Sequence, residues 1–117
     1  MINLEEKLHQ PIAFEGRFAA DLMQDKDNQV KFGMTYVLPD LVKQPYEIFK
    51  LSILSRLLFD GPNSPFYKNI IEAGIAPEYC PGTGFDFTTR NPTFTTGVDG
   101  IKIEDLKKAE NALRNTL

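Results

Sequence analysis

One strongly apolar segment, residues 46–59, most constrains what this chain can fold into. Pro45 stands where a helix can begin, because the first turn leaves its N–H groups unpaired, and Gly61 with Pro62 supplies a turn after it. The apolar side chains recur with a helical period, which predicts a helix that provides the main core. The alternative is that part of this stripe faces a partner helix. The predicted core residues are Ile48, Phe49, Leu51, Ile53, Leu54, Leu57, Leu58 and Phe59.

Two segments before this helix, residues 12–19 and 30–38, alternate apolar and polar side chains as half-buried strands do. A polar cluster in residues 21–29 suits the connection between them. Residues 1–11 show no sustained period and are predicted to be a flexible tail. The apolar positions are Ile12, Phe14 and Phe18 in the first segment and Val30, Phe32, Met34, Tyr36 and Leu38 in the second.

Further elements are predicted after residue 60. Ser64 before Pro65 indicates a helix start, and Gly74 indicates its end. Residues 79–100 are rich in Thr, Phe and Gly, which favours an antiparallel hairpin around residues 90–92. A last helix begins near Glu104 and Asp105, whose charges complement its dipole, and its apolar face contains Leu106, Ala109, Leu113 and Leu117.

The predicted order is therefore β-β-α-α-β-β-α, which places the chain in the α+β class. Helices are expected on one face of a largely antiparallel sheet. A length of 117 residues suits one domain, so we expect residues 12–117 to form a single α+β unit that is an incomplete domain. An incomplete domain should leave apolar surface and a sheet edge open, and we expect self-association for that reason.

Charge and composition exclude several function classes. Thirteen basic against 16 acidic residues give a net charge of −3, so nucleic acid is not an expected partner. No apolar run approaches the roughly 20 residues that span a bilayer, and no secretory signal opens the chain, so no membrane partner is expected. Cys80 and His9 are the only residues of their kinds, which excludes an internal disulfide and a closed zinc site of four Cys or His ligands.

Several polar residues have both a chemical and a simpler interpretation. His9 and Glu5 share a helical spacing and would offer two metal ligands, but a solvated tail explains them better. Cys80 lacks a second histidine as a base, so an inert, partly buried thiol is preferred to a nucleophile. Ser64 directly precedes Pro65, where its oxygen should accept a backbone N–H, and this outweighs a nucleophilic role.

Two other patterns are weaker still. The Gly82-Thr83-Gly84 sequence is similar to a phosphate-binding loop, but strand-forming residues follow it where a helix N-terminus would be needed. Glu104 and Asp105 would point about 100° apart on a helix, so complementing the helix dipole is preferred to acid/base chemistry.

Residues 57–68 read Leu-Leu-Phe-Asp-Gly-Pro-Asn-Ser-Pro-Phe-Tyr-Lys and are followed by Ile-Glu-Ala-Gly at 71–74. This string closely resembles the presequence-protease branch of the pitrilysin/insulinase zinc metallopeptidases, and the resemblance extends over roughly residues 30–108. Two positions depart from the pattern: Phe85 replaces an aromatic residue with a hydroxyl, and Cys80 replaces a small serine-like residue. The motif residues, expected to be structural, are Gly61, Pro62, Asn63, Ser64, Pro65, Phe66, Tyr67 and Lys68.

The resemblance implies a parent enzyme of two halves, each with two similar α+β domains, that enclose a chamber admitting unstructured peptides. This chain would be part of the second, non-catalytic domain of the first half. The family holds its zinc in the first domain with an H-x-x-E-H motif and a distant Glu, and the motif glutamate activates the water. Because that motif is absent here, this chain is expected to bind no zinc and to cleave nothing, while zinc remains the cofactor of the parent.

The resemblance also implies a substrate role for residues 79–87, because relatives pair an incoming peptide with a strand of the second domain. An exposed strand edge offers unpaired backbone groups to any extended peptide, and Gly82 and Gly84 would let its backbone approach. The alternative is an ordinary hairpin whose glycines serve turns or a bulge. The candidate anchoring residues are Tyr79, Cys80, Gly82, Thr83, Gly84, Phe85 and Phe87.

Two functional hypotheses follow. The first is a non-catalytic piece of a peptidase whose partners are unstructured peptides and the remaining domains of the parent. The second is a stand-alone peptide-binding or interaction module with the same fold. An autonomous hydrolase that uses Cys80 or His9 is expected to fail an assay of peptide cleavage. The resemblance implies the mitochondrial matrix as the location of the parent, with plastids and parasite organelles as alternatives.

Overall fold

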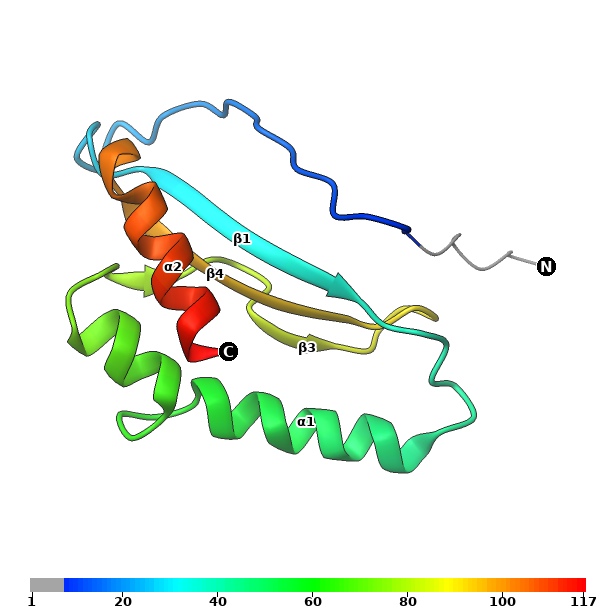
Figure 1. Cartoon of the computed structure of the whole chain (residues 1–117). Helices are drawn as coiled ribbons and strands as arrows, with labels where there is room; N and C mark the ends of the chain where they lie inside the picture. Colours follow the sequence, from blue (N-terminus) through cyan, green and yellow to red (C-terminus); the bar gives the residue numbers. More distant parts are fainter. Residues whose placement is uncertain (1–7) are drawn as a thin grey trace.

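The computed structural model describes residues 8–117 (Figure 1). Helices and antiparallel strands are combined with the helices on one face of the sheet, so the predicted α+β class is confirmed. The elements in chain order are β1 (Val30–Val37), α1 (Pro45–Phe59), the π-helical η1 (Tyr67–Glu72), β2 (Glu78–Tyr79), β3 (Gly84–Asp86), β4 (Thr93–Ile101), the short 3-10 turn η2 (Ile103–Asp105) and α2 (Leu106–Thr116).

β4 is the central strand of a four-stranded sheet. β1 pairs with one side of it, placing Phe32 opposite Val98, and β2 and β3 pair with the other side. The predicted hairpin around residues 90–92 is confirmed as β3 and β4. Its first arm is shorter than expected, because residues 80–83 turn the chain and separate β2 from β3.

The core lies between β4, η1 and α2. Phe66, Ile70, Val98, Ala109 and Leu113 are completely buried. Around them pack Phe59 from the end of α1, Ala76, Phe94 and Ile101. Segments that are far apart in the sequence therefore build the core, and each contributes between one and three of these side chains.

The prediction that α1 supplies the main core is wrong. Of its eight predicted core residues only Phe59 is buried, while Ile48, Leu51 and Leu58 are half-buried. The helix packs mainly against the short strand β3 at the edge of the sheet, so only its inner side is covered. The predicted core residues that remain exposed are Phe49, Ile53, Leu54 and Leu57.

The predicted strand at residues 12–19 is also wrong. All of these residues are exposed, and Phe14 is 92% exposed. A strand needs a neighbour for its backbone groups, and in residues 8–117 no strand pairs with the outer edge of β1. Of the predicted tail, residues 8–11 have no helix or strand and are exposed, and the rest lies outside the described residues.

The two later helices begin where the sequence indicates. The helix after α1 starts at Pro65 but becomes π-helical, with Ala73 N–H donating to the Lys68 carbonyl (3.1 Å). It ends at Glu72, two residues before the predicted Gly74, which lies in the following turn with a φ of +72°. α2 buries Ala109 and Leu113 of its predicted face, while Leu106 is half-buried and Leu117, which follows the helix, is exposed. No helix in the described part of the chain is long and apolar enough to cross a membrane.

Candidate functional site

The Gly-Pro-Asn-Ser-Pro string forms the corner between α1 and η1. Gly61 follows α1 with a φ of +81°, which glycine adopts without strain. The Gly61 carbonyl accepts two hydrogen bonds from Ser64, one from its N–H (3.2 Å) and one from its Oγ (2.9 Å). These bonds close the turn, so the chain reverses direction within residues 61–64 and enters the next helix at Pro65.

The second half of the string anchors this corner. Ser64 Oγ accepts from the Tyr67 N–H (3.4 Å), as expected of a residue that precedes a helix. Phe66 is completely buried, and its ring centroid lies 4.5 Å from that of Phe59. The Ser64 hydroxyl is therefore engaged with the backbone on both sides. The other residues of the string are exposed at Pro62, Asn63, Pro65 and Lys68 and half-buried at Tyr67.

Tyr79 lies in β2 opposite Val98. Its ring packs edge-on against Phe59, with centroids 5.6 Å apart and an interplanar angle of 79°. Burial raises the pKa of the Tyr79 phenol, and the nearby Ser64 hydroxyl acts in the opposite direction. The phenolic oxygen is buried near the Ser64 hydroxyl, but neither this hydroxyl nor any other group of the described residues meets it with hydrogen-bond geometry. Tyr79 therefore points toward the core and contributes packing there.

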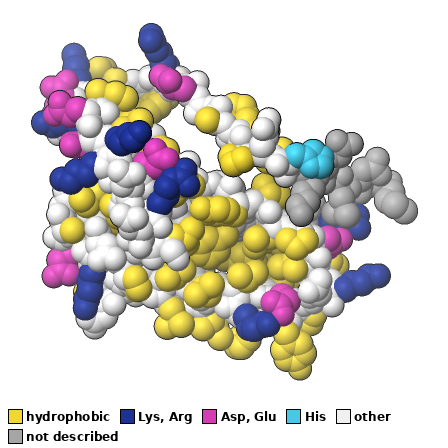
Figure 2. All heavy atoms as spheres, viewed as in Figure 1, with side chains coloured by type: hydrophobic (Ala, Val, Ile, Leu, Met, Phe, Trp, Pro, Cys, Tyr) yellow, Lys and Arg dark blue, Asp and Glu magenta, His cyan; other side chains and the backbone are white. Residues whose placement is uncertain are grey.

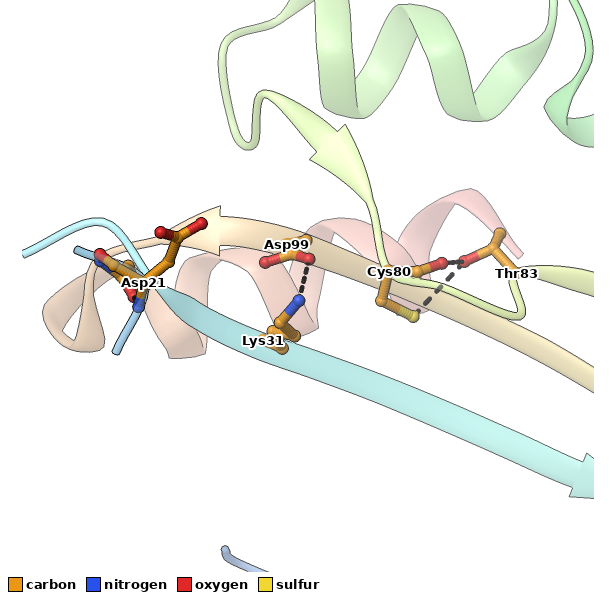
Figure 3. A network of polar contacts seen from close by, with 6 residues as sticks. Asp21, Lys31, Cys80, Thr83 and Asp99 are labelled. Atoms are coloured by element: carbon orange, nitrogen blue, oxygen red, sulfur yellow. Dashed lines mark hydrogen bonds and ion pairs between the residues drawn. The ribbon is translucent and has the colours of Figure 1, made fainter. Parts of the chain in front are cut away.

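Cys80 points to the other side of the sheet. Its N–H donates to the Gly97 carbonyl (3.1 Å), and its Sγ lies 3.4 Å from Thr83 Oγ1. A Cβ added at Gly97 would lie 2.3 Å from this sulfur, so the thiol occupies the space that a side chain would need. Figure 3 shows Cys80 and Thr83 beside β4, in line with the Lys31 and Asp99 pair.

A turn follows directly at residues 80–83. The Thr83 N–H donates to the Cys80 carbonyl (3.2 Å), and Gly82 has a φ of +82°. Pro81 and Gly82 thus occupy the positions that these residues prefer in a type II turn. The glycine at 82 serves the turn, which agrees with the ordinary-hairpin interpretation at this position.

The outer edge of β3 meets α1. The Phe85 N–H donates to Ser55 Oγ (3.0 Å), and a Cβ at Gly84 would lie 2.8 Å from the same oxygen. Gly84 has a φ of +113°, a conformation that side chains rarely adopt. Phe87 is exposed and stacks on Phe85, with centroids 5.6 Å apart. At Phe85, α1 already occupies the edge on which a peptide strand was predicted to pair.

A row of polar and small residues runs along the sheet face that the helices do not cover. Alternate residues of β4 point to opposite faces. Phe94, Val98 and the residue midway between them face the core, and the other residues between Phe94 and Val98 belong to this row. Lys31 Nζ and Asp99 Oδ2 are 2.5 Å apart, and the hydrogen bond to Asp99 raises the pKa of Lys31. The row consists of the cross-strand pairs Lys31 with Asp99, Gly33 with Gly97, and Thr35 with Thr95, whose hydroxyls are 3.0 Å apart.

The predicted anchoring residues do not line one surface. Tyr79 faces the core, Cys80 faces the polar row, and Phe87 lies exposed at the far end of β3. Their common feature is the path of their backbone, which runs alongside β4 from β2 to β3. Sequence reasoning missed Ser55, the hydroxyl that contacts this path, although a serine inside an apolar helix was visible. It also missed the close approach at Gly97, which a glycine inside a strand can indicate.

Residues 8–117 contain no group of three or more His, Cys, Asp or Glu side chains that could hold a metal ion. His9 is exposed, and its proposed companion Glu5 lies outside the described residues. Glu104 and Asp105 lie in η2, directly before α2, where their charges suit the helix N-terminus. The donor set of this chain therefore does not fit a zinc ion held by two imidazoles.

Comparison with known proteins gives one consistent result. The model of the peptidase M16 inactive domain matches residues 6–117. The chain is 39% identical over 93 residues to the mitochondrial presequence protease of Xenopus laevis, covering 80% of this chain and 9% of that protein. It is 42% identical over 83 residues to the one of Schizosaccharomyces pombe, covering 71% and 8%, and 29% identical over 119 residues to the one of Gibberella zeae, covering 97% and 12%. The chain thus spans about a tenth of the length of these relatives.

Proposed function

This chain belongs to the peptidase M16 inactive-domain family, and we propose that it is a non-catalytic part of a longer zinc metalloendopeptidase that degrades presequences and other unstructured peptides. Its role is to form part of the wall of the chamber in which those peptides are cleaved. The observation that carries the proposal is the asymmetry of the sheet, which has helices on one face and the polar row on the other. A chamber wall needs such a layer, with a packed outer side and a wettable inner side.

The zinc chemistry is assigned to residues outside this chain. One histidine and one cysteine cannot supply the two imidazoles and the carboxylates that the parent's zinc site requires. The prediction that the described residues hold no zinc is supported by their donor set and remains to be tested by metal analysis. When bound in the parent, zinc would activate the water that attacks the peptide bond.

Peptide anchoring is proposed at the outer edge of β3. Phe85 stands opposite Phe94, and its N–H points away from β4 toward Ser55. An extended peptide would replace the Ser55 hydroxyl as the partner of this N–H and continue the sheet by one strand. Gly82 and Gly84 carry no side chain that would oppose this approach. α1 covers the edge by packing against β3 and through the Ser55 hydrogen bond, so the peptide would have to displace α1 there.

This anchoring proposal is tested with a fluorescein-labelled unstructured peptide and anisotropy. Ser55→Ala frees the Phe85 N–H, so we expect binding about two- to tenfold tighter, the range that one net hydrogen bond spans. Phe85→Pro removes the donor and should weaken binding. Ser52→Ala is the matched control, because Ser52 bonds only within its own helix. Unchanged affinity in both Ser55→Ala and Phe85→Pro would rule out this edge.

The peptidase assignment is tested by the complete reading frame and by activity. We expect an H-x-x-E-H motif upstream in the same polypeptide and no peptide cleavage by the purified 117-residue chain, with or without zinc. Chelator-sensitive turnover by this chain would refute the proposal. A reading frame without the motif would favour the second hypothesis, a stand-alone peptide-binding module.

Location and self-association are further parts of the proposal. Relatives are named mitochondrial presequence proteases, which supports the mitochondrial matrix for the parent. We propose that self-association of the isolated chain uses the outer edge of β1, which has no strand beside it in residues 8–117. Light scattering at rising concentration measures this, and a clean monomer throughout would contradict it.

A further inference from the structure

α1 is apolar on both of its sides. Its inner side carries Ile48, Leu51 and Leu58, which are half-buried toward the sheet. At 100° per residue, a second stripe lies on the opposite side. That outer stripe consists of Tyr46, Phe49, Ile53 and Leu57, with exposed fractions of 81%, 63%, 42% and 66%. A helix with apolar side chains on two opposite sides normally packs against other elements on both of them.

The outer stripe has the form of a helix-packing surface. Its residues are spaced three, four and four apart, so they make one straight ridge over three turns. Figure 2 shows hydrophobic side chains gathered along the lower rim of the molecule, where α1 lies in Figure 1. The ridge ends at a hollow of about 330 Å³ lined by Ile53, Arg56, Leu57, Asp60, Asn63 and Ser64. A large apolar side chain of a partner helix fits such a hollow.

The charges beside the stripe select the partner. Lys50 lies on one flank and Arg56 on the other, each about 60° from Ile53 around the helix. Glu47 pairs with Lys50 from further back toward the sheet. The one acidic side chain near the stripe among the described residues of the hollow is Asp60, at the end of α1, so the two flanks themselves carry Lys50 and Arg56. In two copies packed stripe to stripe, a cationic flank meets a cationic flank whether the helices run parallel or antiparallel. A second copy is therefore disfavoured, and acidic flanks on the partner are favoured.

We propose that the outer stripe of α1 docks an amphipathic helix whose apolar ridge is flanked by Asp or Glu, and that this helix belongs to another part of the parent polypeptide. This source rests on the proposed function, because the chain spans about a tenth of the length of its relatives. The docked helix covers the side of α1 that faces away from the sheet and inserts a side chain into the hollow beside Ile53 and Leu57.

The charge requirement is tested on the 117-residue chain with two synthetic helical peptides that share one leucine ridge. One peptide has Glu flanks and the other has Lys flanks. In fluorescence anisotropy we expect the Glu-flanked peptide to bind about tenfold more tightly. Lys50→Glu with Arg56→Glu should reverse this preference, and Ile53→Asp should abolish binding. Lys107→Glu with Lys108→Glu makes the same charge change on α2 and should leave the preference unchanged.

Several results would overturn the proposal. The first is that the two peptides bind equally or not at all. The second is self-association of the chain, and the third is its co-sedimentation with phosphatidylcholine vesicles containing phosphatidylserine, if Ile53→Asp abolishes either of them.

The source of the docked helix is tested with a photoreactive benzoylphenylalanine that replaces Ile53 in the full-length parent. A crosslink to an acidic helical segment of the same polypeptide supports the proposal, and a crosslink to a second copy or to none overturns it. If the parent has no H-x-x-E-H motif, the peptidase assignment is wrong, but the preference for the Glu-flanked peptide is unaffected.

Discussion

The sulfur of Cys80 lies where the side chain of residue 97 would be, and only glycine at 97 makes room for it. A Cβ there would lie 2.3 Å from Cys80 Sγ and 2.5 Å from the Phe32 carbonyl oxygen. Residues from β1, β4 and the β2–β3 connection thus meet at one point on the polar row. This contact, three other contacts and the packing of the core each have a consequence that can be measured.

Gly97→Ala is expected to destabilise the fold by about 1 to 3 kcal/mol, because the Phe32 carbonyl oxygen and the Gly33 Cα, 2.5 and 2.9 Å from the added Cβ, belong to the β1 backbone and cannot move away without disturbing the sheet. Urea unfolding monitored by circular dichroism measures the change. Gly33→Ala is the matched control on the neighbouring strand: its nearest contact, Cys80 Sγ, is at 3.5 Å, so the free energy should change by less than about 0.5 kcal/mol. Equal losses for the two variants would contradict the packing described here.

Ser55→Ala should lower the free energy of unfolding by about 1 kcal/mol, since the Phe85 N–H loses its partner. Ser52→Ala removes a hydroxyl one turn earlier that bonds only to the Ile48 carbonyl. Alanine is the better helix former, so this control should be neutral or slightly more stable. Thermal melts of the three proteins provide the comparison, and identical shifts would show that Ser55 does not hold β3 to α1.

The Lys31 and Asp99 ion pair makes stability depend on alkaline pH. The hydrogen bond to Asp99 raises the pKa of Lys31 above its ordinary value of 10.5 in the folded state. A raised pKa means that the folded chain holds this proton more tightly than the unfolded chain. The stabilisation is therefore complete below about pH 10.5 and is lost as the pH rises through the folded-state pKa.

Lys31→Met removes this group, so its unfolding free energy should fall less steeply above that pH than that of the unaltered protein. Denaturant titrations on both sides of the window measure the slope. Lys107→Met is a control on the exposed side of α2. The ion-pair explanation fails if Lys31→Met and Lys107→Met show the same alkaline slope.

Tyr79→Phe is expected to be neutral or to stabilise the fold by up to about 1 kcal/mol. The Tyr79 hydroxyl is buried without a hydrogen-bond partner in residues 8–117, so it has a desolvation cost that phenylalanine avoids. Burial raises the pKa of this phenol, so above pH 10 the unfolded chain loses its proton first and stability falls. The variant should lack that alkaline contribution. A clear loss of stability at neutral pH would show that the hydroxyl has a partner after all.

Phe66→Ala should cost about 3 to 5 kcal/mol, because Phe66 is completely buried in the aromatic cluster with Phe59. Phe49→Ala, which removes the same side chain from the exposed side of α1, should cost less than about 0.5 kcal/mol in the isolated chain. Urea unfolding of the two variants distinguishes this core from one built on α1. If Phe49→Ala cost more stability than Phe66→Ala, the core would lie on α1, as the sequence pattern predicts.

The sequence predicts the local backbone conformation wherever residues that are neighbours along the chain determine it. Pro65 begins a helix and Gly74 lies in the turn that follows it because proline and glycine act through their own backbones. Val30 to Met34 alternate toward the core because a strand has a period of two. The Gly61 to Lys68 string, the class of the fold and the family were accessible in the same way.

What only the tertiary structure decided is which apolar side chains find a partner. Phe18 and Val98 stand in similar alternating patterns, but one is exposed and the other is completely buried, because β4 has strands on both sides and residues 12–19 have none. Phe49 and Phe66 are likewise equal in type, and only Phe66 meets α2 and β4 in the core. Burial depends on contacts between segments far apart in the chain, and hydrophobicity alone does not specify them.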